Sequence, residues 1–530
     1  MARYTVGIDL GTTHTVVAAI DAKGRRKYKA RIVPFEIPQI VDSGEVGKRL
    51  LLPSFLYLPS PHEFPAGALA LPWDAERTWV AGEFARKRGS EVPARLVTSA
   101  KSWLCHGRVD RTAAILPWGA PEEVGRISPV EASARYLRHV KEAWAAETGT
   151  PLEEQDLVLT VPASFDEAAR ELTALAAKAA GLEKITVLEE PQAAFYSWLD
   201  RHRDDWTDLV RPGQLVLVCD VGGGTSDFTL IEVVDDGGKP GFRRVAVGAH
   251  LLLGGDNMDL ALAARLEPEL VGPGGKLDAA QWSSLRLACR LAKEALLGEA
   301  GLERTTVAIP GRGSKLVGGT LKVEVDRRSV EEWLLEGFLP RTAAGDRPQR
   351  GARPGLGALS LPSAHDPAIT RHLAAFLADA GRAAGTGPRR PDLLLYNGGV
   401  FKAECLRRRL LDVLGAWFPE AGPPAALEMP PEDLDLAVAR GASYYGLVRR
   451  GEGVKIAGGT PRSFYVGLAG QPVALCVAPQ GLEEGEEVDV EGREFELLIR
   501  QPVVFPLYTS SHHPEHAAGD LAPIDPETMA

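Results

Sequence analysis

The sequence has 530 residues, of which 45% are hydrophobic and 25% are charged. These proportions are average for globular proteins and exclude a collagen-like chain, a largely disordered chain and a small disulfide framework. The 71 acidic side chains outnumber the 60 basic ones and give a net charge of −11, so no overall positive field favours a nucleic-acid partner. At about 150 residues per domain, the length predicts about three or four domains, or fewer large ones.

Cysteine usage and apolar runs bear on the compartment of the protein. The five cysteines are scattered and form no C-x-x-C pair, which predicts reduced and mostly buried thiols. The chain starts directly with a strand pattern, without the apolar segment of a secretory signal, and it has no run of about 18 apolar residues that would predict a membrane span. We therefore expect a cytoplasmic location and no membrane partner. The cysteines are Cys105, Cys219, Cys289, Cys405 and Cys476.

Two segments of similar pattern organise the chain. Residues 4–20 read YTVGIDLGTTHTVVAAI and residues 215–233 read LVLVCDVGGGTSDFTLIEV. Each has an apolar run that reaches an aspartate (Asp9 or Asp220), then a glycine-rich turn and a second β-rich run, which is typical of a β-hairpin. The repetition predicts a duplicated α/β architecture with two similar lobes.

The segments between and after the hairpins predict further strands and helices. In chain order they are a buried strand at 157–161, helices at 166–180 and 283–297, a strand and turn at 393–399, a basic helix at 406–414 and a helix with small residues at 435–448. Residues 340–367 are dense in Gly, Pro and Arg and show no helical or strand period, so we expect a flexible surface insertion there.

Beyond residue 451 the pattern changes to short strands separated by glycine turns, which predicts a partial β-rich domain over 451–510. The expected strands are at 463–468, 473–477 and 494–500. Residues 511–530 are polar and Pro-rich and predict a disordered tail. Three histidines in this tail, His512, His513 and His516, are a candidate metal site. Without a nearby cysteine or stable element, a solvated tail is the favoured interpretation.

The two glycine-rich turns are candidates for phosphate binding. Glycine leaves backbone N–H groups unshielded, so two such turns that face each other can hold a polyphosphate, with threonine hydroxyls adding hydrogen bonds. The turn residues are Gly11, Thr12 and Thr13 on one side and Gly222, Gly223, Gly224 and Thr225 on the other. One such turn alone is more often an ordinary hairpin, but two in matching context favour the phosphate site.

Carboxylates near these turns are candidate magnesium ligands. Mg²⁺ beside a phosphate is usually held by one or two carboxylates, and Asp9, Asp220 and Asp227 are the candidates. The sequence has no G-x-x-x-x-G-K-[ST] loop, and the G-x-G-x-x-G fingerprint is absent at the first strand. A P-loop enzyme is therefore not indicated.

Five segments in a fixed order carry a resemblance to a known family: GIDLGTTHT, LTVPASFDEAAR, LEEPQAA, CDVGGGTSD with LGGDNMD, and LLLYNGG with DLAVARGA. From Val6 to about Val448 the sequence resembles the nucleotide-binding domain of the 70-kilodalton heat-shock chaperones (DnaK type), within the actin and hexokinase-like ATPase superfamily. The resemblance implies an α/β fold with two actin-like (ribonuclease H-like) lobes and a cleft. The nucleotide-binding domain is expected at 1–450, with lobe I at about 1–208 and 436–450 and lobe II at about 214–435.

The resemblance also implies roles for single residues. Asp9, Thr12 and Thr13 are expected beside the β- and γ-phosphates, opposite Asp220, Thr225 and Asp227. Glu190 resembles the carboxylate near the attacking water, and Lys101, in VTSAKSWLCHG, resembles the lysine that contacts the γ-phosphate. The implied catalytic set is Lys101, Glu190, Asp220 and Thr225. The implied nucleoside contacts are Gly254, Gly255, Asp256 and Lys293, together with Gly398 and Gly399 beneath the adenosine.

Two further positions match residues that transmit the nucleotide state in the family, and several others differ from the family pattern. Pro162 and Arg170 resemble the pair that passes the nucleotide state toward a peptide-binding domain, although a proline after a strand is also a routine terminator. The chain departs from the family pattern on the adenosine side, at Arg290, Leu297, Val400 and Lys402. The acidic, leucine-rich interdomain linker of the family is not evident in RGEGVKIAGGT, which follows the last predicted helix.

The favoured function is a slow, chaperone-like ATPase that uses ATP or ADP with Mg²⁺, and the resemblance also raises K⁺ as a cofactor. It implies unfolded polypeptide clients, a J-domain cochaperone and a nucleotide exchange factor as partners. A small-molecule kinase of the same superfamily and a non-hydrolysing nucleotide-binding scaffold are the alternatives.

Overall fold

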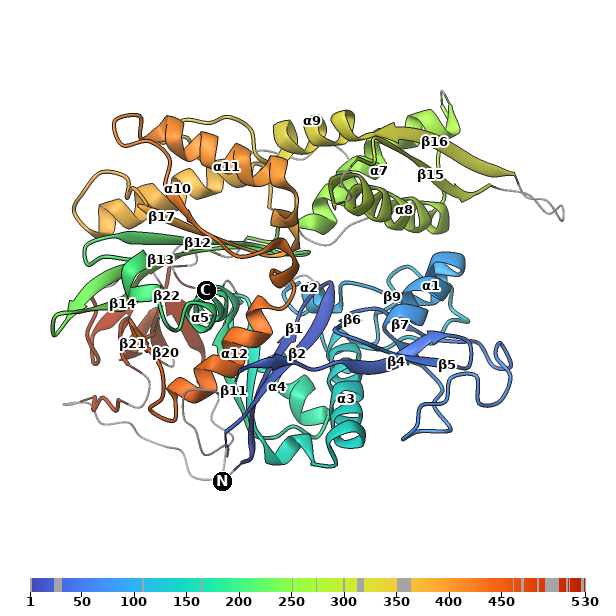
Figure 1. Cartoon of the computed structure of the whole chain (residues 1–530), viewed down its shortest axis with the longest axis horizontal. Coiled ribbons are helices and arrows are strands. Elements are labelled where there is room, and N and C mark those ends of the chain that lie inside the picture. Colours follow the sequence, from blue (N-terminus) through green and yellow to red (C-terminus); the bar gives the residue numbers. More distant parts are fainter. Residues whose placement is uncertain are drawn as a thin grey trace.

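The computed structural model describes residues 2–22, 31–106, 109–163, 165–249, 251–272, 274–298, 301–311, 319–349, 364–460, 462–468, 471–483, 486–490, 505–510, 513, 515–525 and 529. Within these ranges, two lobes are each built around a six-stranded sheet, and a four-stranded sheet follows near the C-terminal end. Lobe II occupies the upper part of Figure 1, and most of lobe I occupies the lower right.

The six-stranded sheet of lobe I has its hairpin at the centre. Strand β1 is antiparallel to β2 and parallel to β10, which is parallel to β11, and β2 also pairs with two short strands, β3 and β6. The strands are β1 (Tyr4–Leu10), β2 (His14–Asp21), β3 (Val33–Pro34), β6 (Leu51–Pro53), β10 (Asp156–Val161) and β11 (Ile185–Glu189).

The six-stranded sheet of lobe II repeats this arrangement. Strand β12 is antiparallel to β13 and parallel to β17, which is parallel to β18, and β13 pairs on its other side with β14. The strands are β12 (Leu215–Val221), β13 (Ser226–Asp236), β14 (Lys239–Val247), β17 (Leu393–Asn397), β18 (Ala425–Leu427) and β19 (Ile456–Ala457). The matching strand orders confirm the predicted duplicated α/β fold.

Helices α5 (Glu190–Arg201) and α12 (Ala437–Val448) lie between the two sheets (Figure 1). Their apolar side chains share one core with both sheets. Small residues let α12 come close to its neighbours, because a Cβ atom at Gly441 would lie 1.6 Å from the carbonyl oxygen of Ala193 in α5. Glycine at this position therefore permits backbone contact between the two helices.

Alternation along β1 places its residues against two different layers. Val6, Ile8 and Leu10 belong to the core that also contains residues of α3 (Pro129–Thr148) and α4 (Glu167–Ala179). The intervening Gly7 faces α12 instead, because a Cβ atom there would lie 2.1 Å from the carbonyl oxygen of Ala439. This period of two is what a strand buried on both faces requires.

Capping residues fix the starts of the two outer helices of lobe I. The side chain of Ser128 accepts a hydrogen bond of 3.0 Å from the backbone N–H of Glu131, and that of Asp166 accepts one of 2.7 Å from Ala169. Each satisfies an N–H group that a helix start leaves without a partner inside the helix. The helix predicted at 166–180 is therefore confirmed, with Asp166 as its cap.

Smaller elements complete lobe I on the side of α1. Two small sheets, β4–β5 and β8–β7–β9, pack with α1, and α2 follows them in the chain. Their bounds are β4 (Ile37–Asp42), β5 (Glu45–Arg49), β7 (Leu56–Tyr57), β8 (Val80–Ala81), β9 (Leu96–Val97), α1 (Glu83–Glu91), α2 (Ala100–Trp103) and, after α5, α6 (Trp206–Leu209).

In lobe II, α7 and α8 pack together beside a hairpin, and α9, α10 and α11 share their core. The bounds are α7 (Gly255–Val271), α8 (Ala279–Gly298), β15 (Arg304–Pro310), β16 (Thr320–Asp326), α9 (Arg327–Phe338), α10 (Ile369–Ala383) and α11 (Glu404–Trp417). The helices predicted at 283–297, 406–414 and 435–448 are confirmed as α8, α11 and α12. Residues 350–363 of the predicted insertion lie outside the described residues.

The C-terminal sheet has the strand order β22–β20–β21–β23. Its strands are β20 (Ser463–Gly467), β21 (Val473–Ala478), β22 (Leu507–Ser510) and β23 (Leu521–Pro523). The strands expected at 463–468 and 473–477 are confirmed as β20 and β21, and the one expected at 494–500 lies outside the described residues.

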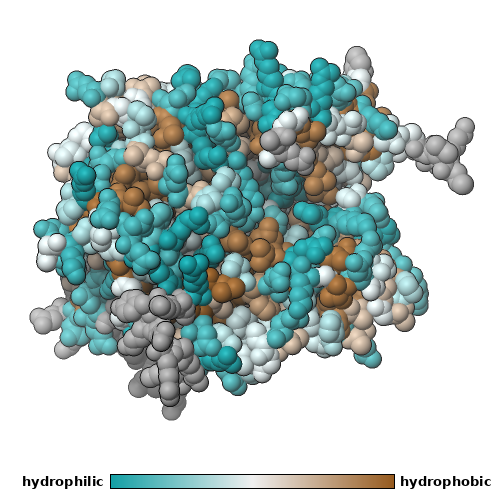
Figure 2. Space-filling view, in the orientation of Figure 1, coloured by the Kyte–Doolittle hydropathy of each residue, from teal (hydrophilic) through white to brown (hydrophobic). Residues whose placement is uncertain are grey.

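Two findings correct the expected C-terminal organisation. The disordered tail predicted at 511–530 is wrong for residues 521–523, because β23 pairs with β21 and Ala522 is buried. The partial β-rich domain was expected from residue 451, yet β19 is added to the sheet of lobe II beside β14. None of the helices in the described parts of the chain has both the length and the hydropathy to cross a membrane. The surface in the view of Figure 2 is mostly hydrophilic.

Candidate functional site

The tips of the two central hairpins have the same backbone contact. The N–H group of Gly11 donates a hydrogen bond of 3.0 Å to the carbonyl oxygen of His14, and that of Gly222 donates one of 3.0 Å to the carbonyl oxygen of Thr225. The first tip is also held by Ser54, whose hydroxyl donates to the carbonyl oxygen of Gly11 at 2.8 Å. The sequence repetition therefore corresponds to a repetition of local structure.

The two tips face each other across the cleft at close range. A Cβ atom at Gly223 would lie 2.3 Å from the hydroxyl oxygen of Thr13, and one at Gly224 would lie 2.4 Å from the hydroxyl oxygen of Ser102. Only glycine fits at such separations without displacement of a neighbour. The loops are therefore near enough to contact one ligand from two sides.

One cavity of about 590 Å³ lies between the tips, and most of the predicted site residues line it. Of the predicted residues it is lined by Asp9, Gly11, Thr12, Thr13, Lys101, Glu190, Asp220, Gly222, Gly223, Thr225, Gly255, Asp256, Lys293, Gly398 and Gly399. Three predicted residues, Gly224, Gly254 and Asp227, do not line it. Asp227 is buried on β13 opposite Asp220 in the strand pairing.

The two leading aspartates occupy equivalent positions. Asp9 is paired with Thr160 of the neighbouring parallel strand, and Asp220 is paired in the same way with Asn397. Thr160 donates a hydrogen bond of 3.3 Å to a carboxylate oxygen of Asp9. The carboxyl ends of parallel strands thus present two acidic side chains to one cavity, where a ligand is expected in such sheets.

A buried ion pair between Lys101 and Glu190 lies among these aspartates. Lys101 is 4% exposed, and the negative charge of Glu190 and Asp9 raises its pKa although burial opposes this. Burial, and then the charge of Glu190, raises the pKa of Asp9 to about 7. The same two causes raise the pKa of Asp220 well above its usual range. Glu190 and Asp9 therefore share the ammonium group of Lys101, Asp220 lies close to both of these carboxylates, and this donor set suits an additional cation.

Backbone hydrogen bonds fasten the second tip to helix α7. The N–H group of Gly255 donates to the carbonyl oxygen of Gly222 at 3.0 Å, and that of Asp256 donates to Gly223 at 2.7 Å. Gly254 caps this helix, and its own N–H donates to the side chain of Asn257. Gly254 and Gly255 are thus placed where they hold the second glycine tip.

Comparison with known proteins agrees with this geometry. A family model described as "Hsp70 protein" matches residues 109–344. The chain is 32% identical over 354 residues to a "Chaperone protein HscA homolog" of Pseudomonas aeruginosa, and this match covers 64% of the chain and 47% of the relative. A homolog of the same name from Methylococcus capsulatus is 32% identical over 330 residues, covering 59% of the chain and 45% of the relative. Over these residues the chain is similar to the Hsp70 family. It spans about half the length of these relatives.

The side of the cavity lined by Lys293 carries its own ion pairs. Lys293 lies 2.6 Å from a carboxylate oxygen of Asp259 and donates to the carbonyl oxygen of Gly255 at 3.2 Å. Arg290 lies 3.7 Å from Asp256 and donates to Glu294 at 3.1 Å. The departure from the family at Arg290 is therefore compensated by acidic neighbours.

Behind the cavity, Glu189 joins both lobes. Its carboxylate accepts hydrogen bonds of 2.9 Å from Arg170 and 2.8 Å from Arg244, which lies on β14 of lobe II. Arg244 also donates to the carbonyl oxygen of Gly459, in the segment that leads to the C-terminal sheet. Arg170, predicted as a signalling residue, is thus linked to that segment by three contacts in series, through Glu189 and Arg244.

The lining residues His14 and Asn397, and Ser99, which does not line the cavity, escaped the sequence reasoning. His14 lines the cavity at the start of β2, where burial, and then the charge of Arg290, lowers its pKa to about 3. Asn397 lines it at the end of β17 and was visible in the sequence as the polar residue before the glycine pair. Ser99, in left-handed conformation with a φ of 54°, donates to Asp256 at 2.6 Å. No pattern in the sequence marks that contact.

Proposed function

We propose that this chain binds ATP and Mg²⁺ in the cleft between its lobes and hydrolyses the ATP slowly to ADP and phosphate. The observation that carries the proposal is the convergence of two glycine tips, two strand-end aspartates and the Lys101–Glu190 pair on one cavity. Phosphoryl transfer to water depends on positioning and charge stabilisation, and this set of groups provides both.

Asp9 and Asp220 are the proposed holders of Mg²⁺. Their pKa values are raised in the protein alone, because carboxylates are crowded together in a buried place, and a divalent cation relieves that crowding. When bound, Mg²⁺ neutralises charge on the phosphate oxygens. Asp227 lies behind Asp220 and is proposed to support it rather than to reach the phosphates.

The other residues hold the triphosphate and the attacking water. The ammonium group of Lys101 neutralises charge on the γ-phosphate, and the hydroxyls of Thr13 and Thr225 orient it. Glu190 or Asp220 accepts a hydrogen bond from the water. Removal of one such electrostatic contact commonly lowers the rate by about 10² to 10³.

The nucleoside is proposed to lie on the side of Lys293, Gly398 and Gly399, which line the same cavity. Arg290 and Lys402 also line it and bring positive charge to this side, although each has an acidic neighbour. K⁺ is a further proposed ligand of the phosphate end, where carboxylates exceed ammonium groups.

A chaperone role is proposed from the family and from the names of the relatives, which are chaperone homologs. Unfolded polypeptide is the proposed client, and a J-domain protein and a nucleotide exchange factor are the proposed partners. The contact between Arg244 and Gly459 supports a link from the lobes to the C-terminal sheet. The protein is proposed to act in the cytoplasm.

A single-turnover experiment tests this function. The protein is mixed with a limiting amount of labelled ATP and Mg²⁺, with and without an unfolded peptide, and phosphate release is followed. Slow release that the peptide accelerates supports the proposal. Release only with a small-molecule acceptor would support a kinase, and tight binding without release would support a non-hydrolysing scaffold.

A further inference from the structure

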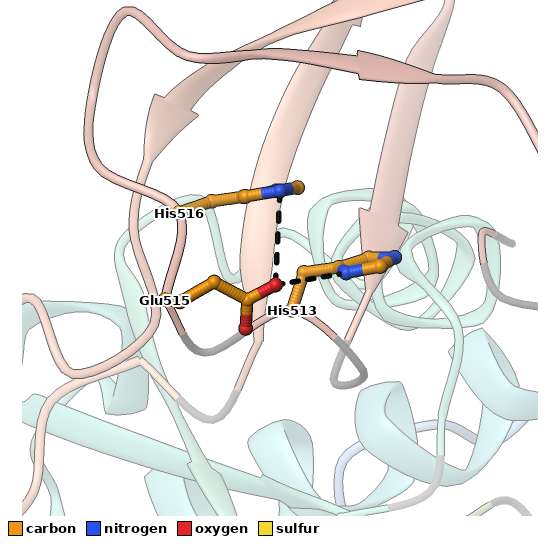
Figure 3. A group of neighbouring side chains, drawn as sticks. All are labelled: His513, Glu515 and His516. Atoms are coloured by element: carbon orange, nitrogen blue, oxygen red, sulfur yellow. Dashed lines mark hydrogen bonds and ion pairs between the residues drawn. The ribbon is translucent and has the colours of Figure 1, made fainter.

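Two histidines and a glutamate form a compact cluster in the connection between β22 and β23. Figure 3 shows the carboxylate of Glu515 beside the rings of His513 and His516, with one oxygen joined to a nitrogen of each ring. One oxygen of Glu515 lies 3.2 Å from Nδ1 of His513 and 3.9 Å from Nε2 of His516. The three candidate ligand atoms all lie within 4.8 Å of one another. His512, the third histidine of the sequence motif, lies outside the described residues.

These separations are close to those of a metal site. Zinc binds imidazole nitrogen and carboxylate oxygen at about 2.0 to 2.2 Å in tetrahedral geometry, so its ligand atoms lie about 3.4 Å apart. The pair of atoms at 3.2 Å already meets this value. At 3.9 Å the separation of Glu515 from His516 is longer, and the 66% exposed side chain of Glu515 can close that difference without disturbing the core. The two imidazole nitrogens, which lie within 4.8 Å of each other, must also come closer when a metal binds.

A buried tyrosine orients one of the two rings. The hydroxyl group of Tyr465, a fully buried residue of strand β20, lies 2.8 Å from Nδ1 of His516. A ring whose Nδ1–H donates to this oxygen has a free electron pair on Nε2, the atom that faces Glu515. Metal-binding histidines usually have such a partner on their second nitrogen.

The cluster lies where a bound metal could stabilise the C-terminal sheet. β22 and β23 are the two edge strands of the C-terminal sheet, and the cluster lies between them in the chain. Beyond the cluster, the N–H group of Cys476 donates to the carbonyl oxygen of Asp520 at 2.8 Å. A metal at the cluster would fasten His513, Glu515 and His516 together, and Tyr465 would link them to the interior strand β20.

We propose that His513, Glu515 and His516 bind one divalent transition-metal ion of the zinc type, oriented by Tyr465. Two imidazoles with one carboxylate favour zinc and its neighbours, whereas Mg²⁺ prefers oxygen ligands alone. The fourth position is left for water. The site is independent of the proposed ATP site and of its hydrolysis, because none of these residues lines the cleft.

Equilibrium dialysis of the full chain against Zn²⁺ tests the proposal. The buffer contains Mg²⁺ to fill oxygen-rich sites and no nucleotide, because nucleotides bind zinc. We expect one tightly bound Zn²⁺ per chain in the wild type and in the control His365→Ala, which removes an exposed histidine elsewhere. The double substitution His513→Ala with His516→Ala should lose that equivalent. Equal binding by the double variant and the control would mean adventitious zinc and would overturn the proposal.

A second variant tests the geometry rather than the ligand count. Tyr465→Phe keeps the buried ring and removes only the hydroxyl group, and we expect it to weaken Zn²⁺ binding by about 10- to 100-fold. Co²⁺ bound in place of Zn²⁺ should give the visible absorption of a tetrahedral site in the wild type and lose it in the double variant. Unchanged affinity in Tyr465→Phe would refute the orienting role, and a Co²⁺ spectrum identical in wild type and double variant would refute the site. Circular dichroism of each metal-free variant checks that it is folded.

Discussion

The hydroxyl group of Ser99 donates a hydrogen bond of 2.6 Å to a carboxylate oxygen of Asp256 across the cleft. Ser99 precedes α2 in lobe I, and Asp256 lies in the first turn of α7 in lobe II. A second cross-cleft bond of 3.1 Å runs from Arg286 to the hydroxyl of Thr98. Both bonds hold the lobes in the closed arrangement, so they bear on how fast a nucleotide can leave.

Removal of the first bond should speed nucleotide release. Hydrogen bonds to charged groups contribute about 1.5 to 3 kcal/mol, so Ser99→Ala should raise the rate of ADP release by about tenfold or more. Stopped-flow fluorescence with a labelled ADP measures this rate. Ser90→Ala, which removes an exposed serine of α1 that donates only to Lys87, is the control and should leave release unchanged. Equal rates in wild type and Ser99→Ala would show that the bond does not restrain the lobes.

Lys101→Ala should abolish most ATP turnover. The ammonium group is the only positive charge in contact with Glu190 among the described residues, and its loss should lower the single-turnover rate by about 10² to 10³. Lys178→Ala, at an exposed position of α4, serves as the matched control. Because this substitution breaks a buried ion pair, the thermal stability of the variant should be measured alongside its turnover. Normal turnover in a folded Lys101→Ala protein would remove this lysine from the mechanism.

Gly223→Ala should weaken nucleotide binding. The added methyl group would lie 2.3 Å from the hydroxyl oxygen of Thr13, so either Thr13 or the second tip must move away from the phosphates. We expect the affinity for Mg²⁺–ADP to fall by at least about tenfold, as measured by titration calorimetry. Gly125→Ala, where a Cβ atom meets nothing within 4 Å, is the control. Binding as tight as in the control would mean that the closed tips are not the binding arrangement.

Glu189 should make stability depend on pH in the acid range. Burial alone would raise its pKa, but the charges of Arg244 and Arg170 lower the pKa below the ordinary 4.5. Its stabilising contribution is therefore complete above pH 4.5 and is lost as the pH falls through the lowered pKa. Urea unfolding between pH 3 and pH 7 should show a steeper acid loss for wild type than for Glu189→Gln. The exposed control Glu154→Gln should follow the wild type, and parallel curves for all three proteins would contradict the assignment.

The sequence predicted the parts of the site that depend on local pattern. An apolar strand, an aspartate and a glycine turn specify a hairpin tip by themselves, so Asp9, Gly11, Asp220 and Gly222 were found without a structure. Ser99 was not found, because its role depends on the approach of a helix from the other lobe. The tail was called disordered for a similar reason, since β23 has three residues and owes its pairing to β21.

Glu189 and Glu190 are consecutive residues at the junction of β11 and α5, and their carboxylates bind cationic side chains on opposite sides of it. Glu190 holds Lys101 inside the cleft, and Glu189 holds Arg170 and Arg244 on the far side. Their Cα atoms are about 3.8 Å apart, so both carboxylates extend from one short stretch of backbone. A path of ion pairs and hydrogen bonds therefore runs from Lys101 through Glu190, one peptide bond, Glu189 and Arg244 to the carbonyl oxygen of Gly459. Binding or release of a ligand in the cleft can therefore alter the segment just before the C-terminal sheet through these few contacts alone.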